Sequence, residues 1–459
     1  MSFDLLIKSA KITTSSGTRE GNLLVKDGRI AAVAAAGIDT AGIVAREVVD
    51  ASGLYALPGM VDLHVHIGEP GKEDKEDVTT GTKAAAAGGV TTIAVMPNCV
   101  PPVNSQAGVL ARADLFRSKS YVDFALLGGA GGESLDHIVE QAEAGVVGYK
   151  SYVGSYREDR RGLLCQGNGD IYDVLRKVSS TGRFIGYHCE DSAVIRRRTH
   201  ELVDAGRADF RAYHESRPEF TEVLATLPLM EMAGATGARL YLVHISCART
   251  VELATVWRDD GADITIETCP HYLIFTDEDM ARLGPFAQVA PPLRSAGEVE
   301  DLWYMLSCGD IDVIATDHAP GTPDEKVKGM KNIFEGGGGL PELEVAWPLM
   351  LDQVKRGRAS LEDLAFLMAE NPARIAGIYP QKASLEAGSD ADIVLVDADA
   401  PHTLSEKSMY TKNQDSARIF DGMSVTGRVE KVFQRGRLIS ERGRLVTDLP
   451  AGARWVRPV

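Results

Sequence analysis

Between Pro58 and Tyr379 the sequence alternates short apolar runs with longer helix-forming segments, and few folds are compatible with this alternation. The expected strands end near His66, Pro97, Gly128, Lys150, His188, His244, Thr268 and Asp317. A repeated β-then-α order with about eight strands closes most simply into a barrel. An open, doubly wound sheet would place a glycine-rich phosphate loop after its first strand, and residues 67–71 do not fit one. We therefore predict an α/β fold with a (β/α)8 TIM barrel over residues 58–379.

The two ends of the chain differ in character from the middle. Residues 4–33 contain short β-rich runs separated by turn signals, and residues 391–439 contain similar runs and turns. Two separate terminal units would each have a very small hydrophobic core. We therefore expect residues 1–57 and 380–459 to form one composite β-sandwich domain, although length alone suggests roughly three domains for such a chain.

Composition excludes several classes of partner. The chain has 49 Lys and Arg against 65 Asp and Glu, a formal net charge of −16, which would repel nucleic acid and an anionic membrane surface. The six cysteines are scattered without metal-binding spacing, as is typical of a reducing cytoplasm. The first residues lack the apolar core of a signal peptide, and no apolar run is long enough to span a bilayer. We expect a cytoplasmic protein that acts on a small molecule, without nucleic acid or membrane partners.

Residues that are costly to bury stand at the ends of the expected strands. They are His64 and His66, Lys150, His188, His244 and Asp317. In a barrel the carboxyl ends of all strands meet at one mouth, so these side chains should converge there. His64 and His66 are two residues apart, which points both imidazoles to the same side of a strand and allows both to hold one metal ion. An HxH pair alone is weak evidence for a metal site, but the other four positions strengthen it.

Lys150 follows an apolar run and has two interpretations. It can form an ordinary salt bridge at a strand end, because a buried ammonium group needs a partner. Alternatively, burial lowers the pKa of its amine, which then captures CO2 and forms a carbamate that bridges two metals. His188 and His244 would complete the second metal site under that interpretation. Each histidine alone is more often a hydrogen-bonded core residue than a ligand.

Asp317 is the candidate catalytic residue. A carboxylate at this place can bind a metal, accept a proton from an activated water and deliver it to a leaving nitrogen, while two divalent cations bring the pKa of that water toward neutrality. Histidine and carboxylate ligands without thiolates suit Zn²⁺ best, and Mn²⁺, Co²⁺ or Fe²⁺ are alternatives.

The motifs around these residues resemble those of the amidohydrolase superfamily, and within it the cyclic amidohydrolases: dihydroorotase, allantoinase and hydantoinase/dihydropyrimidinase. The matching segments are residues 58–66, 148–150, 188–190, 244–246, 269–272, 291–294 and 316–320. The resemblance implies a barrel with a composite β-sandwich and a homotetramer. It also implies one metal held by His64, His66, carboxylated Lys150 and Asp317, and another held by Lys150, His188 and His244.

Departures from the family motifs bear on the substrate. Dihydroorotases bind their substrate's carboxylate through four contacts. Three of them, an Arg, an Asn and a His, are replaced here by Gly68, Ala290 and Gly321, and only the fourth, Asn98, remains. Losing a bidentate Arg costs several kcal/mol, so an uncharged ring substituent is expected. Dihydropyrimidinases place a Tyr where this chain has Ser155, although the next residue is a Tyr.

The resemblance therefore favours an allantoinase-type enzyme that hydrolyses a C–N bond of a cyclic ureide or amide, converting allantoin to allantoate. A hydantoinase acting on 5-substituted hydantoins is the close alternative, dihydroorotase comes third, and a non-catalytic assembly protein comes last because such proteins have lost metal ligands. Asn98, Ala290 and Gly338 are the expected substrate contacts, the last within a run of glycines that we expect to lie over the mouth. His271 and His318 are expected to orient other groups by hydrogen bonds.

Overall fold

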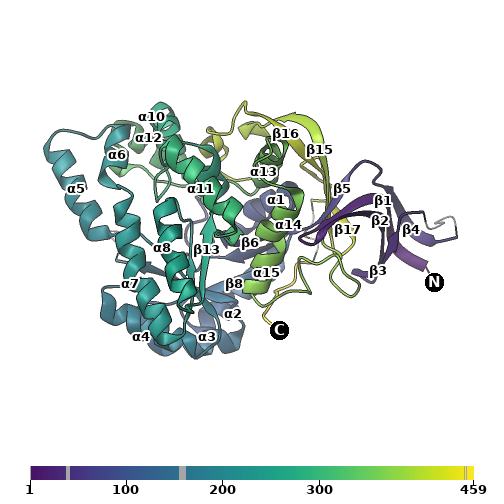
Figure 1. Cartoon of the computed structure of the whole chain (residues 1–459), viewed down its shortest axis with the longest axis horizontal. Helices are drawn as coiled ribbons and strands as arrows, with labels where there is room; N and C mark the ends of the chain where they lie inside the picture. Colours follow the sequence, from purple (N-terminus) through teal and green to yellow (C-terminus); the bar gives the residue numbers. More distant parts are fainter. Residues whose placement is uncertain (1, 38–41, 155–161, 449, 451) are drawn as a thin grey trace.

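The computed structural model describes the chain apart from residues 1, 38–41, 155–161, 449 and 451. A helix-wrapped barrel forms one end of the molecule and a sheet domain the other, with the N-terminus at the far tip of the sheet domain (Figure 1). None of the helices in the described ranges combines the length and hydrophobicity needed to cross a membrane.

The barrel strands are parallel and follow the chain in order around the sheet. They are β6 (Met60–Val65), β7 (Val90–Val95), β8 (Asp123–Gly129), β9 (Gly148–Val153), β11 (Phe184–His188), β12 (Arg239–Leu242), β13 (Ile264–Thr268) and β14 (Val313–Ile314), with the short β10 (Leu164–Cys165) beside β9. A bridge between Val65 and His318 joins the first strand to the segment after the last, and the His66 N–H donates to the His318 carbonyl at 2.9 Å. The predicted barrel is confirmed. The strand expected to end at Lys150 continues to Val153, because Tyr152 and Val153 also pair with β10.

Helices cover the outside of the barrel and extend over its mouth (Figure 1). Their bounds are α1 (Val78–Gly88), α2 (Gln106–Lys119), α3 (Ile138–Ala144), α4 (Asn168–Ser179), α5 (Ser192–Asp204), α6 (Phe210–Ser216), α7 (Phe220–Thr236), α8 (Ala248–Asp259), α9 (Pro270–Ile274), α10 (Asp277–Leu283), α11 (Ala296–Cys308), α12 (Pro323–Lys331), α13 (Ala346–Lys355), α14 (Leu361–Ala365) and α15 (Asn371–Ile375). The 3-10 turns η3 (Gly284–Ala287) and η4 (Ile333–Glu335) lie between them. Local sequence explains their ends: Asp77 caps α1 by accepting from the Thr80 N–H at 2.8 Å, and Gly89 ends that helix with φ +89°.

Both ends of the chain contribute strands to the second sheet. Its members are β1 (Ser2–Thr14), β2 (Gly17–Lys26), β3 (Arg29–Ala35), β4 (Val44–Asp50), β5 (Tyr55–Pro58), β15 (Ile393–Thr403), β16 (Ser424–Gln434), β17 (Arg437–Glu441) and β18 (Arg444–Leu445). Strand β5 joins the two halves, because it pairs with β1 on one side and with β15 on the other. In the described part of the chain these strands form one hydrogen-bonded sheet, with β4 branching from β1.

A buried ion cluster lies where the N-terminal end of β8 meets the segment that leads into β15. The Lys382 ammonium donates to Asp392 at 2.7 Å and contacts Asp390 at 3.0 Å, and it also donates to Asp123. Arg435, at the end of β16, forms a second ion pair with Asp123. The three carboxylates and the lysine are at most 1% exposed. Buried ion pairs therefore connect the barrel to the sheet domain, and each carboxylate is paired with the lysine.

Candidate metal centre and substrate pocket

A cavity of about 650 Å³ opens at the carboxyl ends of the barrel strands, and the sequence-predicted site residues line it. Those lining it are His64, His66, Asn98, Lys150, His188, His244, Ala290, Asp317 and Gly338. Two of these residues have backbone strain: His244 has φ +43° and Asp317 has φ +46°, both in the left-handed region. Strain of this kind at non-glycine residues is concentrated at functional sites, where surrounding contacts enforce it.

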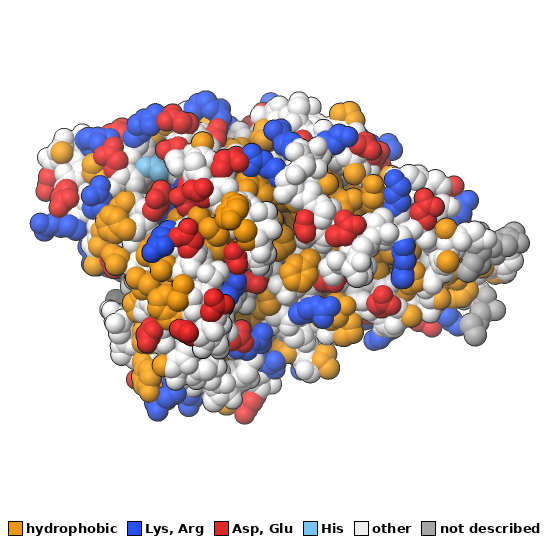
Figure 2. All heavy atoms as spheres, in the orientation of Figure 1, with side chains coloured by type: hydrophobic (Ala, Val, Ile, Leu, Met, Phe, Trp, Pro, Cys, Tyr) orange, Lys and Arg blue, Asp and Glu red, His pale blue; other side chains and the backbone are white. Residues whose placement is uncertain are grey.

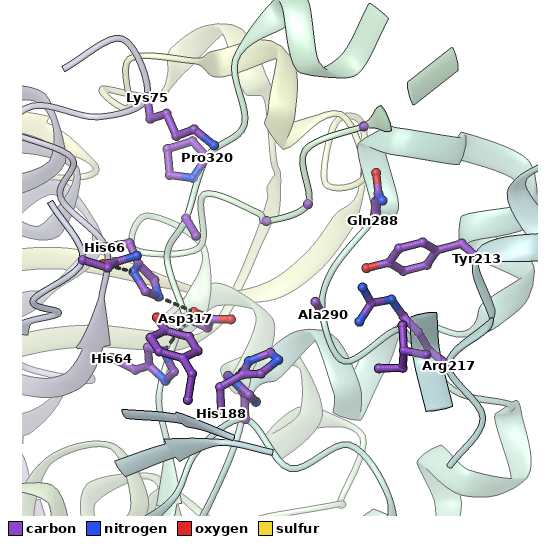
Figure 3. Close-up of a pocket in the computed structure, with 18 of the residues that line it drawn as sticks. His64, His66, Lys75, His188, Tyr213, Arg217, Gln288, Ala290, Asp317 and Pro320 are labelled. Carbon is purple, nitrogen blue, oxygen red and sulfur yellow. Dashed lines mark hydrogen bonds and ion pairs between the residues drawn. The ribbon is translucent and has the colours of Figure 1, made fainter. Parts of the chain in front are cut away.

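Asp317 is the meeting point of the first histidine pair. Its Oδ1 lies 3.1 Å from His64 Nε2 and 3.1 Å from His66 Nε2, and Figure 3 shows the two rings pointing at the carboxylate from one side. Asp62 joins β6 to the segment after β14, because its Oδ1 accepts from the His64 N–H at 3.0 Å and from the Thr316 N–H at 3.3 Å. Asp62 therefore links the first barrel strand to the segment after the last one, close to the contact between the two histidines and Asp317.

The other two histidines form a second pair beside the first. His188 Nδ1 lies 2.9 Å from His244 Nε2, and the ring centroids of His244 and His64 are 5.3 Å apart. One ligand atom each from His64, His244 and Asp317 lies within 4.8 Å of the others, which is a spacing that can hold a metal ion.

Hydrogen bonds on the far side of the rings set their orientation. Glu267, on β13, contacts His64 Nδ1 at 2.7 Å, and the Tyr241 hydroxyl donates to the same carboxylate at 2.7 Å. Asn98 Oδ1 contacts His66 Nδ1 at 2.8 Å. Each ring therefore turns its Nε2 toward Asp317, the arrangement by which proteins orient metal-binding histidines. Asn98, predicted as a substrate contact, lines the pocket but has its side-chain oxygen committed to His66.

The electrostatics favour the protonation states that metal ligands need. Burial lowers the pKa of His66 to about 4 and that of His244 well below its usual value, which keeps both imidazoles neutral. Burial alone would raise the pKa of Asp317, but His64, His66 and His244 together hold it well below the ordinary range, so it is ionised. Neutral imidazoles with an ionised carboxylate are the forms that bind a divalent cation.

The donor set fits a metal centre. His244 Nδ1 is buried and has no hydrogen-bond partner in the described part of the chain, so this nitrogen is left for a ligand. Lys150 is 1% exposed, and its Nζ lies 5.0 Å from the centre of the Tyr152 ring within the same cavity. Nitrogen and carboxylate donors without thiolates suit Zn²⁺, Mn²⁺, Co²⁺ or Fe²⁺.

The opposite wall of the cavity is built mainly from loops. Gln288, Tyr213 and Arg217 face the histidine cluster across the opening in Figure 3. Arg217 is paired with Glu190 at 2.7 Å, and Lys75 at the rim is paired with Glu325 at 2.6 Å, so both cations are already neutralised.

Backbone geometry explains two of the departures noted in the sequence. A Cβ at Gly68 would lie 2.1 Å from the Lys72 carbonyl oxygen, so no side chain fits there. A Cβ at Gly321 would lie 2.9 Å from the Cε of Lys326. Packing therefore excludes a cationic side chain at Gly68, whereas at Gly321 it would have to displace the flexible end of Lys326.

Sequence reasoning missed several residues of the site. Glu267 was seen only as part of a strand, although a carboxylate one residue before the end of an apolar strand was a usable signal. His200, which lies in none of the matching motifs, also lines the cavity. His271 and His318 are buried and contact Glu342 at 2.8 Å and Glu76 at 3.1 Å. Ser155 and the following Tyr lie outside the described residues.

Comparisons with known proteins agree with this geometry. A family profile described as "Dihydro-orotase-like" matches residues 53–250, and one described as "Amidohydrolase family" matches residues 204–439. An allantoinase from Deinococcus radiodurans is 37% identical over 461 residues, covering 100% of this chain and 99% of that protein. An L-hydantoinase from Paenarthrobacter aurescens is 34% identical over 448 residues, covering 97% and 96%. Among solved structures, an L-hydantoinase (dihydropyrimidinase) from Arthrobacter aurescens has a TM-score of 0.94 at 34% identity, covering 99% of this chain and 100% of that one.

Proposed function

This chain belongs to the amidohydrolase family, and from that premise we propose that it is a binuclear metal-dependent hydrolase that opens the ring of a cyclic ureide, as an allantoinase does. The observation that carries the proposal is the convergence of His64 and His66 on Asp317 inside the cavity, with the His188–His244 pair directly beside them. We assign one metal to His64, His66, Lys150 and Asp317, and the other to Lys150, His188 and His244. Zn²⁺ is the metal that this donor set favours most.

Cations held there would lower the pKa of a water molecule and polarise the ring carbonyl. Asp317 is ionised and half-buried in the cavity, so it takes the proton as water adds to the carbonyl carbon. It returns that proton to the ring nitrogen as the C–N bond breaks, which leaves the N–H of an open-chain urea group and a carboxylic acid that loses its proton to solvent at neutral pH. Glu267 and Asn98 keep the His64 and His66 rings aligned throughout.

Allantoin is the substrate that the pocket favours. Its ureido group is polar and uncharged, and two of the cations that line the cavity, Arg217 and Lys75, are ion-paired within the protein. Dihydroorotate carries a carboxylate, and Gly68 and Gly321 lack the side chains that would bind it, with no room for one at Gly68. A 5-substituted hydantoin is the second candidate, because Ile67, Ile195 and Phe334 give part of the cavity an apolar lining and an L-hydantoinase is among the full-length relatives.

A substrate panel tests this assignment. We would compare kcat/KM for allantoin, hydantoin, 5-substituted hydantoins, dihydrouracil and dihydroorotate with metal-loaded enzyme. Allantoin should give the highest value and dihydroorotate the lowest. A highest value for dihydroorotate would contradict the argument from Gly68 and Gly321, and a preference for substituted hydantoins would select the second candidate.

We propose further that Lys150 carries a carbamate formed with CO2. The side chain is buried in the same cavity as the four histidines, where a free ammonium group would oppose cation binding. Lys150→Ala should abolish activity, and short carboxylic acids should restore part of it by supplying the missing oxygen ligands. Lys26→Ala, at an exposed position at the end of β2 that does not line the cavity, serves as the control. Turnover of Lys150→Ala at the wild-type rate would refute the carbamate.

Three coarser expectations stay as predictions. The domain limits at residues 57/58 and 379/380 are supported by the division of the strands between two sheets. A cytoplasmic location is supported by six free cysteines. The homotetramer rests on the family resemblance and is checked by sedimentation.

A further inference from the structure

A buried lysine on the mouth helix α12 stands outside the proposed metal centre. Lys326 is 2% exposed, and its Nζ donates to three backbone carbonyls: Pro285 at 2.7 Å, Gly337 at 3.2 Å and Gly339 at 3.4 Å. Burying an ammonium group is costly unless its hydrogen bonds are satisfied. All three acceptors belong to loops, so this amine serves to join loops rather than to pair with an acid.

Close packing fixes the amine in place. A Cβ on Gly321 would lie 2.9 Å from Lys326 Cε and 3.2 Å from its Nζ, so glycine leaves the space that the lysine fills. On the same helix, a Cβ on Gly329 would lie 2.7 Å from Pro285 Cβ and 3.1 Å from Gly336 Cα. Helix α12 therefore presses directly on both segments that its lysine binds.

The two bound segments form one wall of the substrate cavity. The first continues from η3 into Gln288 and Ala290, and the second is the glycine run 336–339. They also contact each other, because the Gly339 N–H donates to the Gln288 carbonyl at 2.7 Å. A Cβ at Gly338 would lie 3.2 Å from that same carbonyl, so their approach is already tight.

We propose that Lys326 is a positioning residue that sets the spacing of these two loop segments, and so the fit of the cyclic substrate against the wall opposite the metal centre. The inference rests on the proposed function, since the cavity is taken as the place where a cyclic amide or ureide binds. It concerns substrate binding rather than the chemical step, because Lys326 does not line the cavity and contacts neither Asp317 nor the histidines by any hydrogen bond or ion pair given for the described residues. Its loss should therefore change KM more than kcat.

The charge of the amine matters to this role. An ammonium group offers three N–H donors for the three carbonyls, whereas a neutral amine offers two. Burial lowers the pKa of Lys326 to about 7, with Glu325 raising it and Lys75 lowering it. Segments 284–287 and 336–339 contain only Gly, Pro, Phe and Ala, so they add no titratable group. As the pH rises through about 7, one carbonyl loses its donor and the wall loosens, so KM should rise.

The test compares Lys326→Met and Lys326→Gln with Lys328→Met, a matched change at an exposed position on the same helix. At pH 6.5 we expect Lys326→Met to raise KM for the best panel substrate about tenfold, with kcat changed less than about threefold. Lys326→Gln keeps two N–H donors and should fall between wild type and Lys326→Met. Both variants should lose the rise of KM between pH 6 and 8, and Lys328→Met should keep it.

The outcomes separate this inference from the proposed function. If the wild type opens a cyclic substrate but both variants keep a wild-type KM and its pH dependence, the role of Lys326 is wrong and the proposed function stands. If kcat and bound metal fall together while KM is unchanged, the lysine is only structural and the inference is again overturned. If Lys326→Met does not fold, Lys326→Gln decides by the same criteria. A wild type that opens no member of the panel overturns the proposed function and this inference with it.

Discussion

Two groups of acidic and basic side chains lie at opposite ends of the barrel, and they differ in what surrounds their carboxylates. At the lower end three aspartates surround the ammonium group of Lys382, and every carboxylate has a cationic partner. At the mouth, Asp317 faces the imidazoles of His64 and His66, and a buried nitrogen of His244 has no hydrogen-bond partner among the described residues. Both groups have a spacing that can hold a metal ion, but in the lower one all three carboxylates are ion-paired with Lys382.

A cluster of ligand-type residues does not by itself identify a metal centre. What distinguishes it from a structural ion cluster is whether a cationic side chain of the protein already neutralises its carboxylates. Three carboxylates that are ion-paired with a lysine have little negative charge left to attract a metal, whereas an ionised aspartate among histidine ligands attracts a divalent cation. On the face of the molecule in Figure 2, acidic and basic side chains are likewise interspersed. Net charge therefore reveals less about this chain than the local pairing does.

The largest expected effect separates the two groups by activity. Asp317→Asn should lower kcat by about 10³-fold, because it removes the proton-transfer group and a metal ligand. Asp390→Asn, in the other cluster, should leave kcat unchanged per folded molecule. The measurement is steady-state turnover with metal content determined on the same samples. If both variants lost kcat to the same extent, the distinction between a metal centre at the mouth and a structural ion cluster at the lower end would be wrong.

The next effect separates them by stability. Lys382→Met leaves buried carboxylates without their cation and should reduce the free energy of unfolding by about 3–5 kcal/mol, measured in urea. Lys355→Met, which removes an exposed pair with Asp399, should cost at most about 1 kcal/mol. A Lys382→Met protein as stable as the wild type would show that the lower cluster is not closed by its lysine.

A smaller effect concerns the support of the metal ligands. Glu267→Gln should weaken metal binding about 10–100-fold, because the His64 ring loses the carboxylate that orients it. Tyr241→Phe removes one hydrogen bond to Glu267 but leaves the His64 contact, so its effect should be several-fold smaller. Competition with a chelator measures both. Similar affinities for Glu267→Gln and wild type would mean that metal binding alone holds the ring.

The smallest effect is the pH dependence of stability. Burial would raise the pKa of Asp123, but Lys382 and Arg435 hold it below the ordinary value. Its contribution is therefore fully present above the unfolded pKa of about 3.9 and is lost as the pH falls through the lowered, folded-state pKa. Asp123→Asn should lower stability at pH 7 and flatten its dependence between pH 4 and 2. If the free energy of unfolding of Asp123→Asn fell between pH 4 and 2 as steeply as that of the wild type, other groups would cause the acid sensitivity.

Much of the fold could be predicted because it depends on local patterns. Strands such as β8 and β11 are continuous apolar runs between helical segments, and β5 and β15 have strand character at opposite ends of the chain. The end of β9 could not be placed, because Tyr152 and Val153 are paired by β10, a contact that no local pattern encodes.

The site could be predicted only in part. His64 and His66 stand at a strand end that the pattern identifies, so their convergence with Asp317 follows from barrel topology. Two contacts depend on packing between segments that are distant in the sequence: the one between Asn98 and His66, and the hydrogen bond from Lys326 to the glycine run 336–339. Sequence alone therefore identifies which residues carry the chemistry, but not which residues hold them in position.

Diffraction from crystals of the metal-loaded protein, measured at the absorption edge of the metal, tests the central claim most directly. We predict two anomalous peaks about 3.5–4 Å apart at the barrel mouth, between the His64–His66 and His188–His244 pairs, with none among Asp123, Asp390 and Asp392. Absence of peaks at the mouth of fully loaded protein, or a peak in the lower cluster in place of Lys382, would contradict the account.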